Sequence, residues 1–197
     1  AQSLYENGYI TYMRTDSVHL SDQAVNAART QARELYGPEY VGDAPRRYAS
    51  KVKNAQEAHE AIRPAGDVFR TPGEVSGELN PDEFALYDLI WKRTVASQMV
   101  NAQVATTTVK LGATSSTGRD AEFTASGTVT VFAGFYAALK DITEESDDAD
   151  RERELPNLFE GQPVTAVSLD PEGHTTSPPA RFTEAKLVAR LEELGIG

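Results

Sequence analysis

The sequence predicts a mixed α and β protein, with helices in its first half and mainly antiparallel strands in its second half. Apolar residues recur at helical spacing in residues 21–36 and 81–99. From residue 104 onward, stretches rich in Thr and Val with rough alternation replace that spacing and indicate strands. With 197 residues, of which 40% are hydrophobic, the chain is long enough to bury a real core.

The first elements are expected to be the end of a helix and a short strand. A helix over residues 1–7 should stop near Gly8, because the Asn7-Gly8 pair favours a turn. The next five residues, 9–13, are rich in β-forming types and predict a strand. Side chains alternate along a strand, so Tyr12 and Arg14 are expected on the same face.

Three further helices are predicted in the first half. A Ser at the N-cap begins a helix over residues 21–36, and a Gly-Pro pair ends it. A shorter helix is expected over residues 54–62, because Pro64 disfavours helical geometry in the residue before it. Pro81 suits the first turn of a buried helix that runs to about Met99.

The second half is expected to be mostly β structure, followed by one helix. Residues 104–111 and 122–132 predict two strands, and residues 163–169 predict a third. The Gly-containing segments 112–118 and 170–173 predict turns. After these, Thr183 is a good cap for a final helix over residues 184–194.

Composition and charge leave the partner open. A net charge of −11 argues at first against nucleic acid, but most of the excess lies in the acidic run 141–154, whereas residues 44–63 are locally basic. We interpret the acidic run as a solvated loop, with a partner-binding tail as the alternative. The absence of cysteine fits a reducing cytoplasm, and no apolar run is long enough to span a membrane. Lacking an initiator Met, the chain is expected to be part of a longer protein.

The stretch LYENGYITYMRTDS, residues 4–17, carries the most chemical information. A phenol with a guanidinium beside it, as expected for Tyr12 and Arg14, suits attack on a phosphate. A phenol is mostly protonated at neutral pH and is a poor nucleophile, whereas a fixed cation favours the phenolate and stabilises charge on phosphoryl oxygens. From these residues alone, a packed Tyr12 beside a surface Arg14 is the alternative.

The stretch NAQEAHEAIRP, residues 54–64, is the second candidate. On the expected helix, His59 and Arg63 lie one turn apart and share a face. His59 can donate a hydrogen bond to a phosphate or move a proton near neutral pH, and Arg63 would be a second phosphate contact. A surface or capping histidine is the alternative reading of His59.

Four motifs in register resemble those of one family. LYENGYITYMRTDS at residues 4–17 is similar to the active-site tyrosine signature of bacterial type IA DNA topoisomerases. QEAHEAIRP at 56–64 resembles the second signature of that family. LYDLIWKR at 86–93 and PPARFTEAKLV at 178–188, which runs on to ELGIG, resemble two further blocks. One such motif can arise by chance, but four in order identify the chain as a member of the family.

The resemblance implies an enzyme that cleaves one strand of single-stranded DNA through a 5′-phosphotyrosine intermediate. A second strand passes through the gap and the break is resealed, which relaxes negative supercoils without ATP. By position, Tyr12 is the nucleophile, Arg14 is the neighbouring cation, and His59 acts near the scissile phosphate. Thr15 and Asp16 complete the signature and are expected to contact DNA, although spacing assigns them no role.

The resemblance also implies a toroidal fold in three parts. Residues 1–98 would be a helix-rich, winged-helix-like tyrosine domain, residues 99–176 a β-rich arch that acts as a hinge, and residues 177–197 the entrance to the next base domain. The family's acidic metal-binding domain, with its DxDxxE pattern, is not matched here, so Mg²⁺ is expected in the complete enzyme but not on this chain. We therefore expect little or no cleavage by this chain alone. The expected partners are single-stranded or underwound DNA and the remaining domains of the same polypeptide.

Two other functions compete with this interpretation. A tyrosine recombinase also uses Tyr, Arg and His, but it links to a 3′ phosphate and leaves the downstream motifs unexplained. A non-catalytic, winged-helix-like DNA-binding module would have Tyr12 merely packed. Such a module would bind duplex DNA by sequence, and its binding would not change in Tyr12→Phe.

Overall fold

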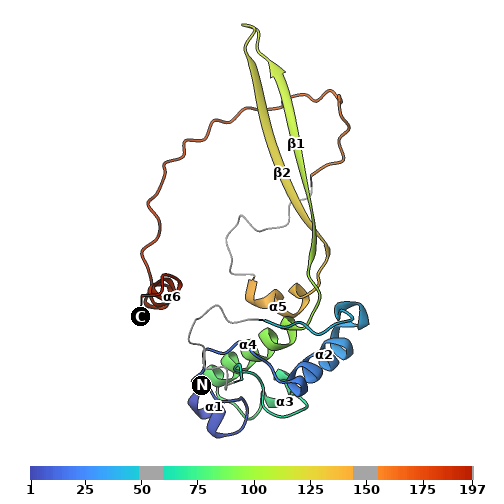
Figure 1. Cartoon of the computed structure of the whole chain (residues 1–197). Helices are drawn as coiled ribbons and strands as arrows, with labels where there is room; N and C mark the ends of the chain where they lie inside the picture. Colours follow the sequence, from blue (N-terminus) through green and yellow to red (C-terminus); the bar gives the residue numbers. More distant parts are fainter. Residues whose placement is uncertain (49–59, 144–154, 197) are drawn as a thin grey trace. The chain divides into compact units, whose positions relative to one another are not determined.

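The computed structural model describes residues 1–48, 60–143 and 155–196, and its fold is mixed α and β, as predicted. The chain divides into two compact units, residues 1–156 and 157–197. In the first unit, helices are followed by a long two-stranded ribbon (Figure 1). No helix in the described ranges combines the length and apolar character that a membrane span requires.

Residues 1–99, called the helical module below, contain the helices that precede the strands. Ser21 caps α2, accepting a hydrogen bond from the Ala24 amide at 3.3 Å, and Asn80 caps α4 together with Glu83. The helices expected over residues 21–36 and 81–99 are therefore confirmed, as is the short first helix. The elements are α1 (Gln2–Glu6), α2 (Asp22–Tyr36), the 3-10 turn η1 (Pro38–Tyr40), α3 (Pro72–Val75) and α4 (Pro81–Ser97).

The core of the helical module lies where α2 packs on α4. Alanines on the buried face of α2 keep that helix thin, so the large side chains of α4 can pack against it. The Trp91 indole donates a hydrogen bond to the Gln31 side chain at 2.8 Å, and the Gln31 amide donates to the Phe69 carbonyl. These bonds satisfy polar groups that burial would otherwise leave unpaired. The buried contributors include Ala24, Ala28, Ala32, Phe69, Tyr87, Trp91 and Val95.

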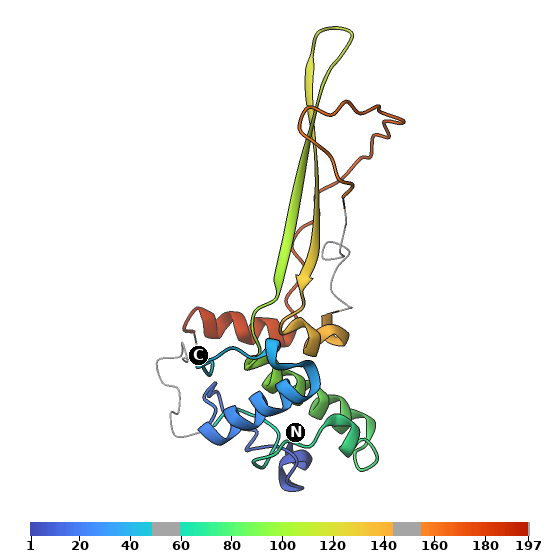
Figure 2. The same ribbon diagram turned by 90° about the vertical axis from the view of Figure 1, so that its right-hand side faces the viewer.

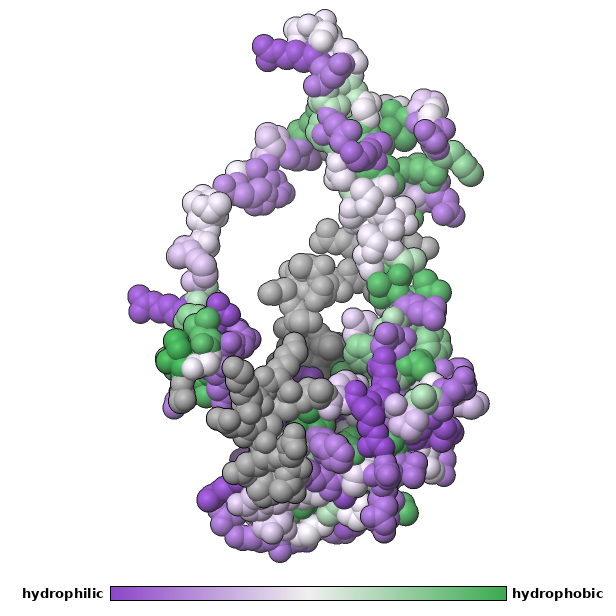
Figure 3. Space-filling view, viewed as in Figure 1, coloured by the Kyte–Doolittle hydropathy of each residue, from purple (hydrophilic) through white to green (hydrophobic). Residues whose placement is uncertain are grey.

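The ribbon is a β-hairpin of β1 (Gln103–Thr114) and β2 (Asp120–Phe132), paired antiparallel. Figures 1 and 2 show it as a long, twisted pair of strands, and its middle is pale in Figure 3, the colour of Thr, Ser and Gly. Both expected strands are confirmed, but each is longer than predicted. The turn is consequently residues 115–119, closed by a 2.8 Å bond from the Ser115 amide to the Arg119 carbonyl, and not residues 112–118.

The base of the hairpin is tied to the helical module. The Val100 amide donates to the Tyr40 carbonyl at 2.8 Å, and the Phe135 amide donates to the Val100 carbonyl at 2.9 Å. The Tyr40 and Phe132 rings lie 4.8 Å apart. Helix α5 (Tyr136–Thr143), which the sequence did not predict, follows β2 and packs beside α4.

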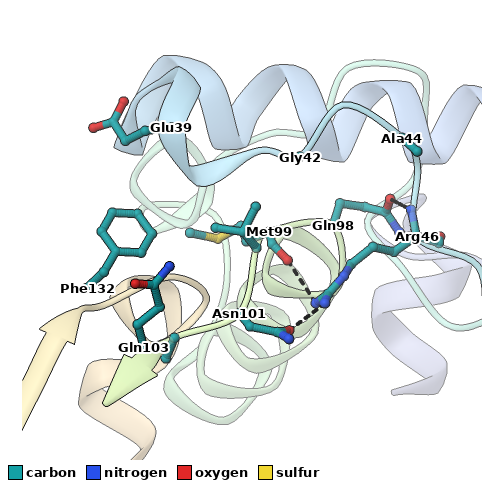
Figure 4. Close-up of a pocket in the computed structure, with 11 residues that line it drawn as sticks. Glu39, Gly42, Ala44, Arg46, Gln98, Met99, Asn101, Gln103 and Phe132 are labelled. Carbon is teal, nitrogen blue, oxygen red and sulfur yellow. Dashed lines mark hydrogen bonds between the residues drawn. The ribbon is translucent and has the colours of Figure 1, made fainter. Parts of the chain in front are cut away.

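A pocket of about 610 Å³ opens at this joint (Figure 4). Arg46 crosses it and donates to the Met99 carbonyl at 2.9 Å and to the Asn101 side chain. The Gln98 side chain binds both the amide and the carbonyl of Arg46, each at 3.1 Å. The pocket is therefore part of the joint that fixes where the hairpin begins.

Two predicted strands are wrong. Residues 9–13 form only a single bridge pair, Ile10 with Pro64. The two amides that would extend the ladder donate elsewhere, Tyr9 to the Leu4 carbonyl and Arg63 to the Thr11 hydroxyl. Residues 163–169 are not a strand, since the described part of the second unit offers no partner strand. Among the described residues of the second unit, the one helix is α6 (Glu184–Glu193). Thr183 caps it as expected, and its hydroxyl accepts from the Lys186 amide at 3.3 Å.

Two other predictions lie largely outside the described residues. Of the expected helix over 54–62, residues 60–62 are not helical, and the rest is not described. Of the acidic run 141–154, residues 141–143 belong to α5, so the run does not begin as a loop. Its remaining residues are not described.

Candidate active site

Tyr12 lies at the start of an exposed loop, residues 12–18, called the signature loop below. Gly8, with φ of +75°, reverses the chain after α1, and the Tyr9 amide then donates to the Leu4 carbonyl at 2.8 Å. The side chain of Tyr12 is 41% exposed. The turn at Gly8 therefore places Tyr12 on the surface and not in the core.

The signature loop keeps the alternation of a strand without its ladder. From residue 11 to residue 18, half-buried and exposed side chains alternate, and Tyr12, Arg14 and Asp16 are the exposed ones near its start. The Thr15 hydroxyl accepts from the Ser17 amide at 3.0 Å, which is a local turn. Exposed and half-buried side chains therefore alternate as the sequence predicted, although the predicted strand over residues 9–13 does not form.

Sequence reasoning missed Tyr5, which lies against Tyr12. The two rings meet edge to face, with centroids 5.4 Å apart and planes at 74°. Tyr5 is on α1, and only the reversal at Gly8 brings it to Tyr12. No local pattern in the sequence signals this contact, because it depends on how the turn folds back.

Both ends of the signature loop are held by the last residues of the second motif. At the beginning, the Thr11 amide donates to the Arg63 carbonyl at 2.9 Å. At the end, the Ala61 amide donates to the His19 carbonyl at 2.8 Å. Residues 61–63 thus close the loop that carries Tyr12, which joins the first two sequence motifs in space.

Arg63 is buried, with only 8% of its surface exposed. Its guanidinium forms an ion pair with Glu60 at 2.9 Å and donates to the carbonyls of Pro64 and Gly66 at 2.8 and 3.0 Å. It also lies over the Phe69 ring, 5.8 Å from the centroid. These partners all belong to the protein, so the role of Arg63 as a DNA contact stays a prediction.

Glu60 links this segment to the start of α2. Its carboxylate accepts from the Ser21 amide at 2.8 Å as well as from Arg63. Burial raises the pKa of Glu60, but the hydrogen bonds from Arg63 and Ser21 outweigh it, and the net pKa is lowered. The ionised form of Glu60 is therefore the one that holds the two segments together.

A second cluster, called the Tyr9 cluster below, anchors Tyr9, the residue before the bridge between Ile10 and Pro64. The Tyr9 hydroxyl donates to Glu78 at 2.7 Å, and the Arg70 guanidinium donates to the same carboxylate. These bonds, from Arg70 first and Tyr9 second, lower the pKa of Glu78 to about 2, and the bond to Glu78 raises the pKa of Tyr9. Tyr87 reinforces the cluster by donating to the Arg70 carbonyl at 2.6 Å.

The remaining predictions concern a histidine and a metal. His59 lies outside the described residues, so the structure brings Tyr12, Arg14, Thr15 and Asp16 onto one loop without placing that histidine. In the part of the chain that is described, no three His, Asp or Glu side chains gather as a metal site.

The chain belongs to the family of bacterial type IA DNA topoisomerases that its motifs indicated. The family model described as DNA topoisomerase matches residues 1–197. Among curated proteins, the chain is 61% identical to DNA topoisomerase 1 of Mycolicibacterium smegmatis and 59% identical to that of Streptomyces coelicolor. Each match covers 100% of this chain and 21% of the relative.

A solved structure shares the fold. The full-length topoisomerase I of Thermotoga maritima aligns with a TM-score of 0.69 and 36% sequence identity. The alignment covers 96% of this chain and 28% of that protein. The chain thus spans about a fifth of the length of its curated relatives and somewhat more of the shorter solved one.

Proposed function

We propose that this chain is the tyrosine-bearing part of a topoisomerase that cleaves and reseals one strand of single-stranded DNA, with Tyr12 as the nucleophile. The observation that carries the proposal is the placement of the signature tyrosine. Tyr12 is 41% exposed and stands at the start of a loop that residues 61–63 hold at both ends. A nucleophile for a large substrate needs this combination of access and fixed position.

The reaction exchanges one phosphate ester for another. The phenolic oxygen of Tyr12 bonds to phosphorus as the bond from phosphorus to the 3′ oxygen breaks. The electron pair of that bond goes to the 3′ oxygen, which takes up a proton, while the phenol gives its proton to a base. Resealing reverses these steps, so no ATP is needed and supercoils relax when a second strand passes through the break.

The other signature residues divide the remaining tasks. Arg14 supplies a cation to the phosphoryl oxygens through its planar fork of donors. His59 donates to, or exchanges a proton with, the reacting phosphate. Thr15 and Asp16 contact the DNA beside the reacting phosphate. The exposure of Asp16 supports such a contact, and the local turn at Thr15 supports a role in shaping the loop. A DNA contact by Arg63 would require its guanidinium to leave the Glu60 ion pair.

The rest of the proposal concerns the complete enzyme. Residues 1–98 serve as the tyrosine domain, residues 99–176 as the arch and residues 177–197 as the entrance to the next domain. Mg²⁺ is held by residues outside this chain, in other domains of the complete enzyme. This chain needs those domains in order to cleave DNA. The hairpin, exposed along most of its length and tied at its base, supports the role of the arch as a hinge.

A covalent-trapping experiment tests the proposal. A 3′-end-labelled single-stranded oligonucleotide is mixed with the chain alone, and with the chain plus the metal-binding portion of the Mycolicibacterium smegmatis relative and Mg²⁺. A denaturing gel then separates labelled protein adducts. We expect an adduct only in the complemented mixture, because attack at the 5′ phosphate leaves the 3′ label on the protein.

Two variants serve as test and matched control. Tyr12→Phe removes the nucleophilic oxygen and should abolish the adduct, whereas Tyr5→Phe removes the neighbouring phenol and should leave it. An adduct that survives in Tyr12→Phe, or none from a mixture in which the added portion is folded and bound, would overturn Tyr12 as nucleophile. Robust cleavage by the chain alone would overturn the need for other domains.

A further inference from the structure

We propose that Thr11 is a positioning residue for Tyr12, and that its hydroxyl fixes the nucleophile against the chain that bears the second motif. This inference rests on the proposed function of Tyr12. It concerns the side chain of the residue directly before the tyrosine, which the family signature alone leaves without a task.

The Thr11 hydroxyl has two partners on the opposite segment. It donates to the Ala61 carbonyl at 2.9 Å and accepts from the Arg63 amide at 3.0 Å. A hydroxyl has one donor and two acceptor sites, so a single side chain can pair with both backbone groups. Val in this position would fill the space but could make neither bond.

The backbone beside Thr11 gives this hydroxyl its importance. The residue already donates its own amide to the Arg63 carbonyl, but the ladder stops at the bridge between Ile10 and Pro64. The next bond of the ladder would run from the Arg63 amide to the Thr11 carbonyl, but that amide donates to the Thr11 hydroxyl instead. The Thr11 side chain therefore supplies the last cross-links before the chain leaves for the signature loop, and Tyr12 is the next residue.

The same segment also holds the far end of the loop. The Ala61 residue that accepts from Thr11 donates its amide to the His19 carbonyl at 2.8 Å. Ala61 follows His59 by two positions in the sequence. The Thr11 hydroxyl thus connects the backbone at Tyr12 to the backbone of the second motif, and its loss would shift the phenol relative to the groups that act on the same phosphate.

The test compares three variants in a full-length polypeptide that carries this chain. Thr11→Val keeps the shape and removes the hydroxyl, and Thr11→Ser restores the hydroxyl. Thr94→Val is the matched control, because its buried hydroxyl donates to the Ile90 carbonyl at 2.8 Å within α4. Each protein is mixed at saturating concentration with a 3′-end-labelled single-stranded oligonucleotide, and the rate constants of cleavage and resealing are measured.

Misplacement of a nucleophile by about 1 Å can cost about 100-fold in rate. We expect Thr11→Val to slow cleavage and resealing by similar factors, about 10- to 100-fold, because both steps pass through the same transition state. The dissociation constant of the oligonucleotide and the cleavage equilibrium should stay within about twofold, since Tyr12 and the DNA-binding groups remain. Thr11→Ser should recover most of the rate, and Thr94→Val should match the wild type.

Three results would overturn the inference. They are a wild-type rate in Thr11→Val, an equal loss in Thr94→Val that marks a general effect of destabilisation, and no recovery in Thr11→Ser. A Tyr12→Phe protein is included to separate the two proposals. If that protein still forms the adduct, the proposed function fails, whereas an adduct lost in Tyr12→Phe but unchanged in Thr11→Val contradicts only the role of Thr11.

Discussion

The helical module and the β-hairpin belong to one unit of the molecule, yet they are stabilised in different ways. The module buries a continuous core between α2 and α4 and satisfies its buried polar groups with side-chain hydrogen bonds. The hairpin exposes both faces along most of its length and depends on its backbone ladder and cross-strand pairs. Stability is therefore local, and we expect the hairpin to open at a lower free energy than the module.

The difference suits the two tasks proposed for them. A nucleophile requires a fixed environment, which the module provides through Thr11, the Arg63–Glu60 pair and the Tyr9 cluster. An arch that swings requires a thin element tied firmly at one end. The predictions below test whether the boundary between these two kinds of stability lies at the base of the hairpin.

The largest effect is expected from truncating an aromatic side chain in the module. Phe69 is 1% exposed, so Phe69→Ala should lower the free energy of unfolding by about 3–5 kcal/mol. Phe123 on the hairpin is 50% exposed, and Phe123→Ala should cost less than about 1 kcal/mol. Urea denaturation followed by fluorescence of Trp91, the only tryptophan, measures both. If both substitutions lowered the free energy of unfolding equally, as reported by Trp91, Phe123 would contribute to the core of the module as much as Phe69 does.

A smaller effect is expected at the joint itself. Gly134 has φ of +50°, and a Cβ there would lie 2.5 Å from the Ala102 amide nitrogen and overlap the Asn101 backbone. Gly134→Ala should therefore cost about 2–3 kcal/mol. Gly112 lies in β1, and a Cβ there would meet no atom of the described structure within 4 Å. Gly112→Ala should be neutral or stabilising by up to about 1 kcal/mol in the same denaturation experiment.

The contrast between these glycines depends on a close approach of two chain segments. If Gly134→Ala proved as harmless as Gly112→Ala, the entering and leaving segments of the hairpin would not be packed together. The joint would then be loose, and the boundary between module and hairpin would not lie there.

Local signals in the sequence predicted most of the module and the hairpin, because those signals act within a few residues. Ser21 and Pro81 mark helix starts by capping and by restricted φ, and alternation of Thr and Val marks the two strands. The wrong strand over residues 9–13 had the right composition. It failed because the two amides that would extend its ladder bond elsewhere, Tyr9 to the Leu4 carbonyl and Arg63 to the Thr11 hydroxyl, which no local pattern around Tyr12 reveals.

The same distinction applies to the candidate site. Tyr12 could be found from its motif, and the exposed alternation of Tyr12 and Arg14 follows from an extended backbone. The ring contact with Tyr5 and the bonds from Thr11 to residues 61–63 are contacts of the folded chain. They depend on the turn at Gly8 and on the path of a segment about fifty residues away, so the sequence alone could not predict them.

A charge on the surface of the module should give a smaller, pH-dependent effect. Hydrogen bonds from Arg70 and Tyr9 lower the pKa of Glu78 from 4.5 to about 2. A lowered pKa in the folded state means that the stabilisation is complete above pH 4.5 and is lost as the pH falls toward 2. Glu78→Gln should therefore reduce the loss of stability over that range, measured as the urea midpoint of Trp91 fluorescence.

Arg70→Gln offers a control for this assignment, since it removes the main cause of the lowered pKa. Its pH dependence should lie between those of the wild type and Glu78→Gln, because the hydrogen bond from Tyr9 remains. Adding Arg70→Gln to Glu78→Gln should change the pH dependence little. Glu60, Glu74 and Glu83 also have lowered pKa values, so the acid dependence should be reduced and not abolished. An unchanged slope in Glu78→Gln would mean that the Tyr9 cluster does not stabilise the module.

The smallest effect is expected in the hairpin, where single cross-strand pairs carry the side-chain contribution. Thr106 and Thr128 face each other in register, and their hydroxyl oxygens lie 3.0 Å apart on an exposed face. A double-mutant cycle with Thr106→Ala and Thr128→Ala should give a coupling of about 0.2–1 kcal/mol. Amide hydrogen exchange of β1 and β2 measures it, because exchange reports local opening. Neither threonine is part of the core around Trp91, so the fluorescence transition should not move. If the fluorescence transition shifted by as much free energy as the hairpin loses in protection from exchange, the module and the hairpin would unfold together. A thin hairpin could not then bend while the surroundings of Tyr12 stay fixed.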